Sequence, residues 1–126
     1  MTLLEKVNQI YAAVAELPKP SPVFEDLTWV EMAGGPYGGV YDSAQSIVGN
    51  VFSRLGSEWD DFKLNPDVFL ESPGYVTVIG RYTGAFKETG KNIDARVVHL
   101  WKEENGKIYF EQFTDTALFY EAMKKD

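Results

Sequence analysis

Apolar and polar residues alternate along residues 92–116, and this pattern predicts a long β-hairpin. The side chains that share one face of its first strand are Ile93, Ala95, Val97, His99 and Trp101. Their spacing of two residues is that of a half-buried strand. Asn105-Gly106 follows and predicts the turn, because both residues tolerate the positive φ of a type I′ turn. The hairpin therefore places the only histidine of the chain, His99, on an otherwise apolar face.

At the N-terminal end, apolar residues recur at helical spacing and predict a helix over residues 3–16. Thr2 and Glu5 fit a capping box at its start. The prolines at 18, 20 and 22 end it, because proline lacks a backbone donor. The polar face of this helix lacks the basic residues of a membrane-surface helix, so we interpret its apolar stripe as core packing.

The middle of the chain predicts a short strand over residues 27–33, a glycine-rich turn over 34–39 and a second helix after a cap at Asp42-Ser43. Gly56 is expected to end that helix, and residues 57–62 to form a turn or a short helix that presents Trp59. Strands are expected over residues 67–71 and 75–87, and a closing helix over 116–125.

This order of elements predicts a single α+β domain over residues 1–126. Its helices are expected to pack on one face of a curved sheet of antiparallel strands. At 126 residues the chain is long enough for one hydrophobic core but not for two.

Composition narrows the function classes. A net charge of -7 argues against nucleic acid and anionic membranes as partners, because both call for clustered Lys and Arg. The chain has no cysteine, hence no disulfide, thiolate nucleophile or thiolate metal site. It has no apolar run of membrane-spanning length and no signal-peptide pattern, so we expect a cytoplasmic protein.

No motif in the sequence predicts a metal or a cofactor. One histidine among scattered carboxylates lacks the spacing of a zinc or iron site. The glycines at 34–39 fit neither phosphate-binding motif, and no GxSxG nucleophile elbow is present.

Several short motifs, in order, resemble the SnoaL-like and ketosteroid isomerase-like branch of the nuclear transport factor 2 superfamily. The resemblance covers nearly the whole chain, and its motifs are WVEMAG (29–34), PYGGVY (36–41), EWD (58–60), YTG (82–84), HLW (99–101), GKI (106–108) and FTDT (113–116). The resemblance implies a cone-shaped, cystatin-like α+β fold with an apolar cavity. Members include isomerases, polyketide cyclases, dehydratases, epoxide hydrolases and non-catalytic binding proteins, so the fold alone does not name the reaction.

Four polar residues are candidates for catalysis: Tyr11, Glu31, His99 and Asp115. The resemblance implies that Tyr11 corresponds to an oxyanion-binding tyrosine and that Glu31 lies near a catalytic aspartate. It also implies that His99 lies near an acid of the isomerases and a histidine of the cyclases, and Asp115 near the cyclases' acid/base aspartate.

Each candidate also has a purely structural interpretation. Tyr11 and His99 are equally interpreted as hydrogen-bonded core residues, and Glu31 as a solvated residue beside the glycine turn. Asp115 also fits the N-cap of the last helix. Gln112 has the opposite strand parity from Asp115 and is ranked lower.

The aromatic residues predict a closed apolar pocket for one small hydrophobic or aromatic molecule. Those expected to line it with His99 are Trp29, Tyr37, Trp59, Trp101 and Phe113. One hypothesis is cofactor-independent proton transfer on a carbonyl compound, with Asp115 or Glu31 as base, His99 as acid or donor, and Tyr11 or Tyr37 steadying an enolate oxygen. The alternatives are a non-catalytic binding protein and an epoxide hydrolase, whose Asp–Arg–Asp set would have to use Arg81 or Arg96.

The outward face of the hairpin predicts a partner. Val98 and Leu100, flanked by Asp94 and Arg96, are expected to point away from the core. Exposed aliphatic side chains on a sheet suggest an isologous homodimer, which the resemblance also favours.

Overall fold

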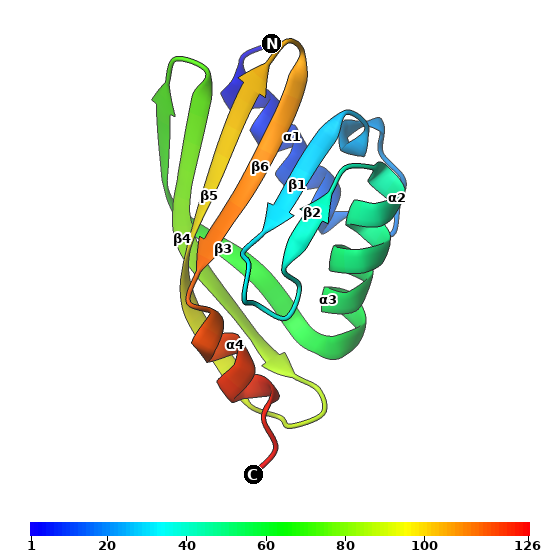
Figure 1. Cartoon of the computed structure of the whole chain (residues 1–126), viewed down its shortest axis with the longest axis vertical. Helices are drawn as coiled ribbons and strands as arrows, with labels where there is room; N and C mark the ends of the chain where they lie inside the picture. The colour runs from blue at the N-terminus through cyan, green and yellow to red at the C-terminus, as the bar shows by residue number, and fades with distance from the viewer.

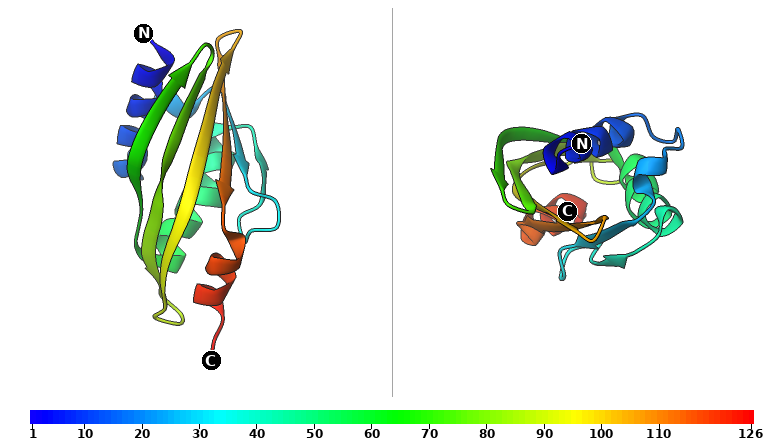
Figure 2. Two further views of the ribbon diagram at one scale, coloured as in Figure 1. Left: turned by 90° about the vertical axis from the view of Figure 1, so that its left-hand side faces the viewer. Right: turned by 90° about the horizontal axis from the view of Figure 1, so that it is seen from above.

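A curved six-stranded sheet wraps around one long helix and one broken helix (Figure 1). The computed structural model describes all 126 residues. Seen along its long axis, the sheet forms one wall, and the helices close the other (Figure 2, right). The two termini lie at opposite ends of the long axis (Figure 1). This is the mixed α+β fold that the order of elements predicts.

Apart from α1, the helices are short. The helical elements are α1 (Leu3–Ala15), a 3₁₀ turn at Pro22–Phe24, α2 (Ala44–Ile47), a π-helical turn at Val48–Phe52, α3 (Ser53–Glu58) and α4 (Thr116–Met123). The segments from α2 to α3 run on as one broken helix (Figure 1). None of the helices is long and apolar enough to cross a membrane.

The strands are β1 (Leu27–Glu31), β2 (Gly39–Tyr41), β3 (Trp59–Ser72), β4 (Tyr75–Phe86), β5 (Asn92–Glu104) and β6 (Lys107–Thr114). Their order across the sheet is β2-β1-β6-β5-β4-β3. The predicted hairpin forms as β5 and β6, with Asn105 and Gly106 at φ of 53° and 77° in its turn. The capping box also forms, because Thr2 Oγ1 accepts from the Glu5 N–H at 3.1 Å and Glu5 Oε1 accepts from the Thr2 N–H at 3.0 Å.

Three details differ from the sequence prediction. β1 pairs with β6 in parallel, so one pair of the expected antiparallel sheet is reversed. β2 begins at Gly39, the last residue of the predicted turn, and runs to Tyr41, where no strand was predicted. β3 begins at Trp59, so the predicted turn or short helix at 57–62 and the limits 67–71 are wrong. Register shifts at Asp60/Lys63 and Pro66/Val68 break the alternation that would have revealed this strand.

Alternate residues of the central strands point into the core. On β5 the residues at 93, 95, 97, 99 and 101 are buried, as the alternation predicts. α1 packs against the sheet through Val7 and Ile10, which are fully or almost fully buried. The concave face of the sheet and the helices therefore enclose one interior, where the polar residues described next are found.

Candidate functional site

A cavity of about 360 Å³ lies between the concave face of the sheet, α1 and α3. Its wall is mostly apolar and includes Val14, Leu17, Trp29, Val51, Phe52, Leu55, Trp59, Phe62, Leu64 and Phe119. The polar residues that line it from the sheet are Glu31, Tyr82, His99 and Gln112, together with Asp61 and Lys63 of the edge strand β3, and Tyr11 lines it from α1. An apolar chamber with a few convergent polar groups is typical of a small-molecule site.

His99 lies at the centre of these polar groups and is 4% exposed. Its Nδ1 lies 2.7 Å from the Tyr11 hydroxyl and its Nε2 lies 2.6 Å from the Tyr82 hydroxyl. Burial lowers the pKa of His99 to about 3, because no carboxylate contacts the ring and the apolar surroundings disfavour the charged form. His99 is therefore a neutral imidazole at physiological pH.

Glu31, at the end of β1, is 5% exposed. Its Oε2 accepts from Trp29 Nε1 at 3.0 Å, and its Oε1 accepts from Gln112 Nε2 at 3.3 Å. Burial raises the pKa of Glu31 to about 7, although the two donors oppose the shift. A carboxyl group with such a pKa exchanges a proton readily near neutral pH.

Gln112 on β6 links Glu31 to the histidine. Its Nε2 also donates to the Tyr82 hydroxyl at 2.8 Å, and its Oε1 accepts from the Met32 backbone N–H at 3.2 Å. The five side chains Tyr11, His99, Tyr82, Gln112 and Glu31 thus form one continuous chain, which we call the buried network. Burial also raises the pKa of Tyr11 and of Tyr82, which keeps both phenols protonated.

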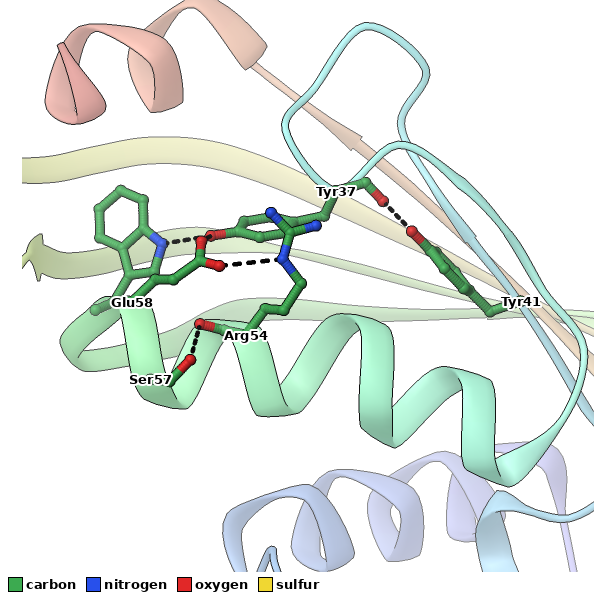
Figure 3. A network of polar contacts seen from close by, with 6 residues as sticks. Tyr37, Tyr41, Arg54, Ser57 and Glu58 are labelled. Atoms are coloured by element: carbon green, nitrogen blue, oxygen red, sulfur yellow. Dashed lines mark hydrogen bonds and ion pairs between the residues drawn. The ribbon is translucent and has the colours of Figure 1, made fainter.

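A second group of polar side chains meets the same cavity through Tyr37 and Trp59 and is shown in Figure 3. Tyr37 donates from its hydroxyl to Glu58 Oε1 at 2.6 Å and accepts from Trp59 Nε1 at 2.8 Å. Arg54 donates from Nε to Glu58 Oε2 at 3.1 Å, and its guanidinium lies 4.5 Å from the Tyr37 ring centroid. These four residues, the loop cluster, tie the β1–β2 loop to α3.

Most of the predicted site residues come together. Tyr11, Glu31 and His99 are members of the buried network and line the cavity, as do Trp29, Tyr37 and Trp59. Tyr37 does not have the free hydroxyl expected of an enolate donor, because Glu58 and Trp59 already occupy it. Trp101 is fully buried behind the wall, where its Nε1 donates to the Tyr11 hydroxyl at 3.0 Å.

Two predicted residues lie elsewhere. Phe113, expected in the pocket, is on the outer face of the sheet and is 41% exposed. Gln112 takes the inward place instead, since neighbouring strand residues point to opposite faces. Asp115 is the N-cap of α4, accepting from the Ala117 N–H at 3.2 Å, and does not line the cavity. The structural alternative for Asp115 is therefore correct.

Tyr82 was not among the predicted site residues, and Gln112 was ranked low. The alternation along their strands indicates that both point inward: Tyr82 shares its face with Val76 and Val78, and Gln112 shares its face with Phe110. The arginines named for an epoxide hydrolase do not reach the cavity, because Arg81 pairs with Asp94 and Arg96 with Asp67. No group of three His, Cys, Asp or Glu side chains in the structure has the geometry of a metal site.

Comparison with solved structures decides the family. No protein-family profile and no curated protein sequence matches the chain. An NTF2-like protein from Burkholderia thailandensis has 41% sequence identity to it over 98% of each chain, with a TM-score of 0.84. The chain belongs to the NTF2-like family.

Two more distant structures share the NTF2-like fold. A hypothetical protein with a ketosteroid isomerase-like fold from Catenulispora acidiphila, solved in complex with trimethylamine, is 16% identical over 99% of this chain and 96% of its own, with a TM-score of 0.78. A protein described as a SnoaL-like polyketide cyclase from Jannaschia is 15% identical over 94% and 89%, with a TM-score of 0.74. These two matches confirm the predicted fold, and the Burkholderia thailandensis match confirms the predicted superfamily.

Proposed function

We propose that this NTF2-like protein binds one small hydrophobic or aromatic carbonyl compound in its cavity and moves a proton on it without a cofactor. The observation that carries the proposal is the place of Glu31, a carboxyl group facing an apolar cavity with its pKa raised to about 7. A base of that pKa is partly ionised at neutral pH and keeps enough basicity to take a proton from a carbon next to a carbonyl.

The other polar groups would act as donors. His99, with a pKa of about 3, does not serve as an imidazolium acid at neutral pH. Tyr11 and Tyr82 have hydroxyls in the cavity wall and are suited to hydrogen-bond the oxygen of an enolate as its charge develops. Isomerisation, aldol-type cyclisation and dehydration all use this arrangement of one base and oriented donors.

The test begins with the ligand that co-purifies, identified by mass spectrometry, or with acetophenone as a stand-in aromatic ketone. Exchange of the hydrogens next to its carbonyl for deuterium in D₂O is followed by NMR. Glu31→Gln should lower the exchange rate by about 100-fold or more, with little effect on affinity. Glu58→Gln, which removes the carboxyl group of the loop cluster, is the matched control and should exchange at the wild-type rate. Equal rates for Glu31→Gln and wild type would refute the catalytic role.

Non-catalytic binding is the second candidate, and one observation favours it. Both oxygens of Glu31 already accept hydrogen bonds from the protein, so this carboxyl group also serves to hold Trp29 and Gln112 in place. The Catenulispora protein was solved with the small organic ligand trimethylamine, which supports small-molecule binding in this fold. A ligand that binds Glu31→Gln and wild type alike, and that neither variant turns over, would identify a binding protein.

We also propose that a second copy of the chain covers the outer face of the sheet. Val98 lies between Ile79 and Phe113 in the ladder, so three apolar side chains adjoin on this face. Phe113 is 41% exposed. A self-complementary apolar patch on a sheet suits an isologous dimer. Sedimentation at micromolar concentration should show a dimer that Phe113→Glu dissociates, and a wild-type monomer would refute it.

A further inference from the structure

The Tyr11–His99–Tyr82 chain contains more polar hydrogens than hydrogen bonds within the chain that could hold them. A neutral imidazole has one N–H and one bare nitrogen that only accepts. Both ring nitrogens of His99 contact a phenol, at 2.7 Å for Tyr11 and 2.6 Å for Tyr82. Each contact holds one hydrogen, but the two hydroxyls and the ring N–H supply three. One phenol hydrogen is therefore left over.

The neighbours of the phenols cannot take this hydrogen. Trp101 Nε1 donates to the Tyr11 oxygen, and Gln112 Nε2 donates to the Tyr82 oxygen. An indole N–H and an amide NH₂ are donors only. Both phenols line the cavity. The surplus hydrogen thus belongs to the phenol that faces the protonated ring nitrogen, and its acceptor has to be found in the cavity.

We propose that the tautomer of His99 selects which phenol, Tyr11 or Tyr82, donates a hydrogen bond to an oxygen of the bound ligand. With hydrogen on Nδ1, Tyr82 donates to Nε2 and the Tyr11 hydroxyl is free. With hydrogen on Nε2, Tyr11 donates to Nδ1 and the Tyr82 hydroxyl is free. The inference rests on the proposed binding of a ligand in this cavity and does not require catalysis. His99 is a positioning residue in this scheme, because it acts through the two tyrosines.

The two ends of the chain make the same kinds of contact. Each phenol oxygen accepts one hydrogen bond from a side-chain N–H and contacts one nitrogen of His99. Burial lowers the pKa of His99, so the ring stays in the neutral form that has two tautomers. The free protein should accordingly populate both, with the ligand shifting the balance.

Exchange between the two arrangements conserves every hydrogen, whether a bound ligand or, in the free protein, water from the solvent takes up one hydrogen and returns another. Starting with hydrogen on Nε2, the Tyr82 O–H bond breaks as its hydrogen passes to the ligand, and the Nε2–H hydrogen passes to the Tyr82 oxygen. At the other end the Tyr11 hydrogen passes to Nδ1, and the Tyr11 oxygen takes a hydrogen from the ligand. The ligand gains one hydrogen and loses one, and no net charge is created. This favours a carbonyl compound with a second exchangeable hydrogen, such as a β-dicarbonyl or a hydroxy-enone.

The single histidine of the chain makes the tautomer directly measurable. In protein labelled with ¹⁵N only in the histidine ring, NMR separates a nitrogen that bears hydrogen from a bare one. Wild type should show both nitrogens at intermediate shifts. Tyr82→Phe should move the hydrogen to Nδ1 and Tyr11→Phe should move it to Nε2, because a buried N–H without an acceptor is less tolerated than a bare nitrogen without a donor. A histidine whose tautomer is fixed by other contacts would show the same tautomer in both variants.

The ligand part of the test uses acetophenone and α-methylstyrene, which have the same shape but differ in the oxygen. Acetophenone should shift wild-type His99 toward one tautomer and bind about tenfold more tightly than α-methylstyrene, as expected for one buried hydrogen bond. α-Methylstyrene should leave the tautomer ratio unchanged.

Three results would overturn the proposal: an imidazolium at neutral pH, one fixed tautomer in wild type and both variants, or no preference for acetophenone. The wild-type spectra decide the first, and the two affinities measured with wild type decide the last, even where a variant fails to fold. These spectra do not depend on turnover. Loss of the catalytic role of Glu31 would therefore leave this inference standing, and its own failure would leave the role of Glu31 intact.

Discussion

The buried network and the loop cluster use the same side-chain types beside one cavity but differ in their surroundings. Each contains a carboxyl group and at least one tyrosine, and in each a tryptophan N–H donates a hydrogen bond, from Trp29 to Glu31 and from Trp59 to Tyr37. Glu58 of the loop cluster has Arg54 at 3.1 Å, and the side chains of this pair are 29% and 43% exposed. Glu31 of the buried network has no cation within salt-bridge distance and is 5% exposed.

This difference in surroundings indicates a structural role for the loop cluster and makes the buried network suited to proton transfer. In the loop cluster the arginine and solvent satisfy the carboxylate, so the charge serves to fasten the β1–β2 loop to α3 (Figure 3). In the buried network the only partners of Glu31 are neutral donors, and its pKa rises. A change of pH should therefore alter the contribution of the buried network to the unfolding free energy, and a change of salt concentration should alter that of the loop cluster.

The largest expected effect is the acid sensitivity that His99 confers. Its pKa is about 3 in the folded protein and 6.5 in the unfolded chain. The unfolded state binds more protons between these values, so stability is lost as the pH falls below 6.5. Acidification from pH 7 to pH 4 should cost about 3 kcal/mol of unfolding free energy through this residue. His99→Gln, which cannot be protonated, should lose that part of the pH dependence in urea titrations. An equally steep loss in the variant would contradict the buried, neutral state of His99.

The second effect, through Glu31, has the opposite sign. Its pKa is about 7 in the folded protein and 4.5 in the unfolded chain. The folded state binds more protons between these values, so this contribution is present at low pH and is lost as the pH rises through 7. From pH 5 to pH 8 it should amount to about 2 to 3 kcal/mol. The difference in unfolding free energy between wild type and Glu31→Gln should change with pH by that amount. Glu58→Gln keeps Glu31, so its difference from wild type should lack this change.

The fold was largely predictable because most of its elements have regular patterns. The residues that line one face of β5 and the Asn105-Gly106 turn are local features, so the hairpin followed from short-range rules. The long edge strand β3 was not predictable over its full length, because its bulges at Asp60/Lys63 and Pro66/Val68 interrupt the period.

The site was predictable only in part. Alternation placed His99 inward and, extended to β4 and β6, would have placed Tyr82 and Gln112 there as well. The resemblance led to Asp115, but a residue directly before a helix is also a natural N-cap, and the structure has it in that role. The contacts of His99 with two tyrosines far away in sequence depend on tertiary packing, which no local pattern contains.

Tyr37→Phe should have a smaller effect, because it removes one hydroxyl from the loop cluster. The substitution leaves Trp59 Nε1 without its acceptor and Glu58 without one of its donors. Glu58 is partly exposed and can bind water instead, so the expected loss is about 1 kcal/mol of unfolding free energy. Tyr41→Phe is the matched control, since its hydroxyl bonds only the Tyr37 carbonyl, at 2.8 Å. It should cost less than Tyr37→Phe in the same urea titrations.

The smallest effect is expected for Arg54→Met, which keeps a long side chain over the Tyr37 ring but removes the charge. Arg54 and Glu58 form an i,i+4 pair near the surface, and such pairs contribute about 0.5 kcal/mol. Salt screens this contribution, so the stability difference between Arg54→Met and wild type should shrink as the salt concentration rises to about 1 M. The pH-dependent difference of Glu31→Gln should be almost insensitive to salt, because burial rather than a neighbouring charge is the main cause of the Glu31 pKa shift. If salt changed both differences equally, the buried network and the loop cluster would not be distinct in their electrostatics.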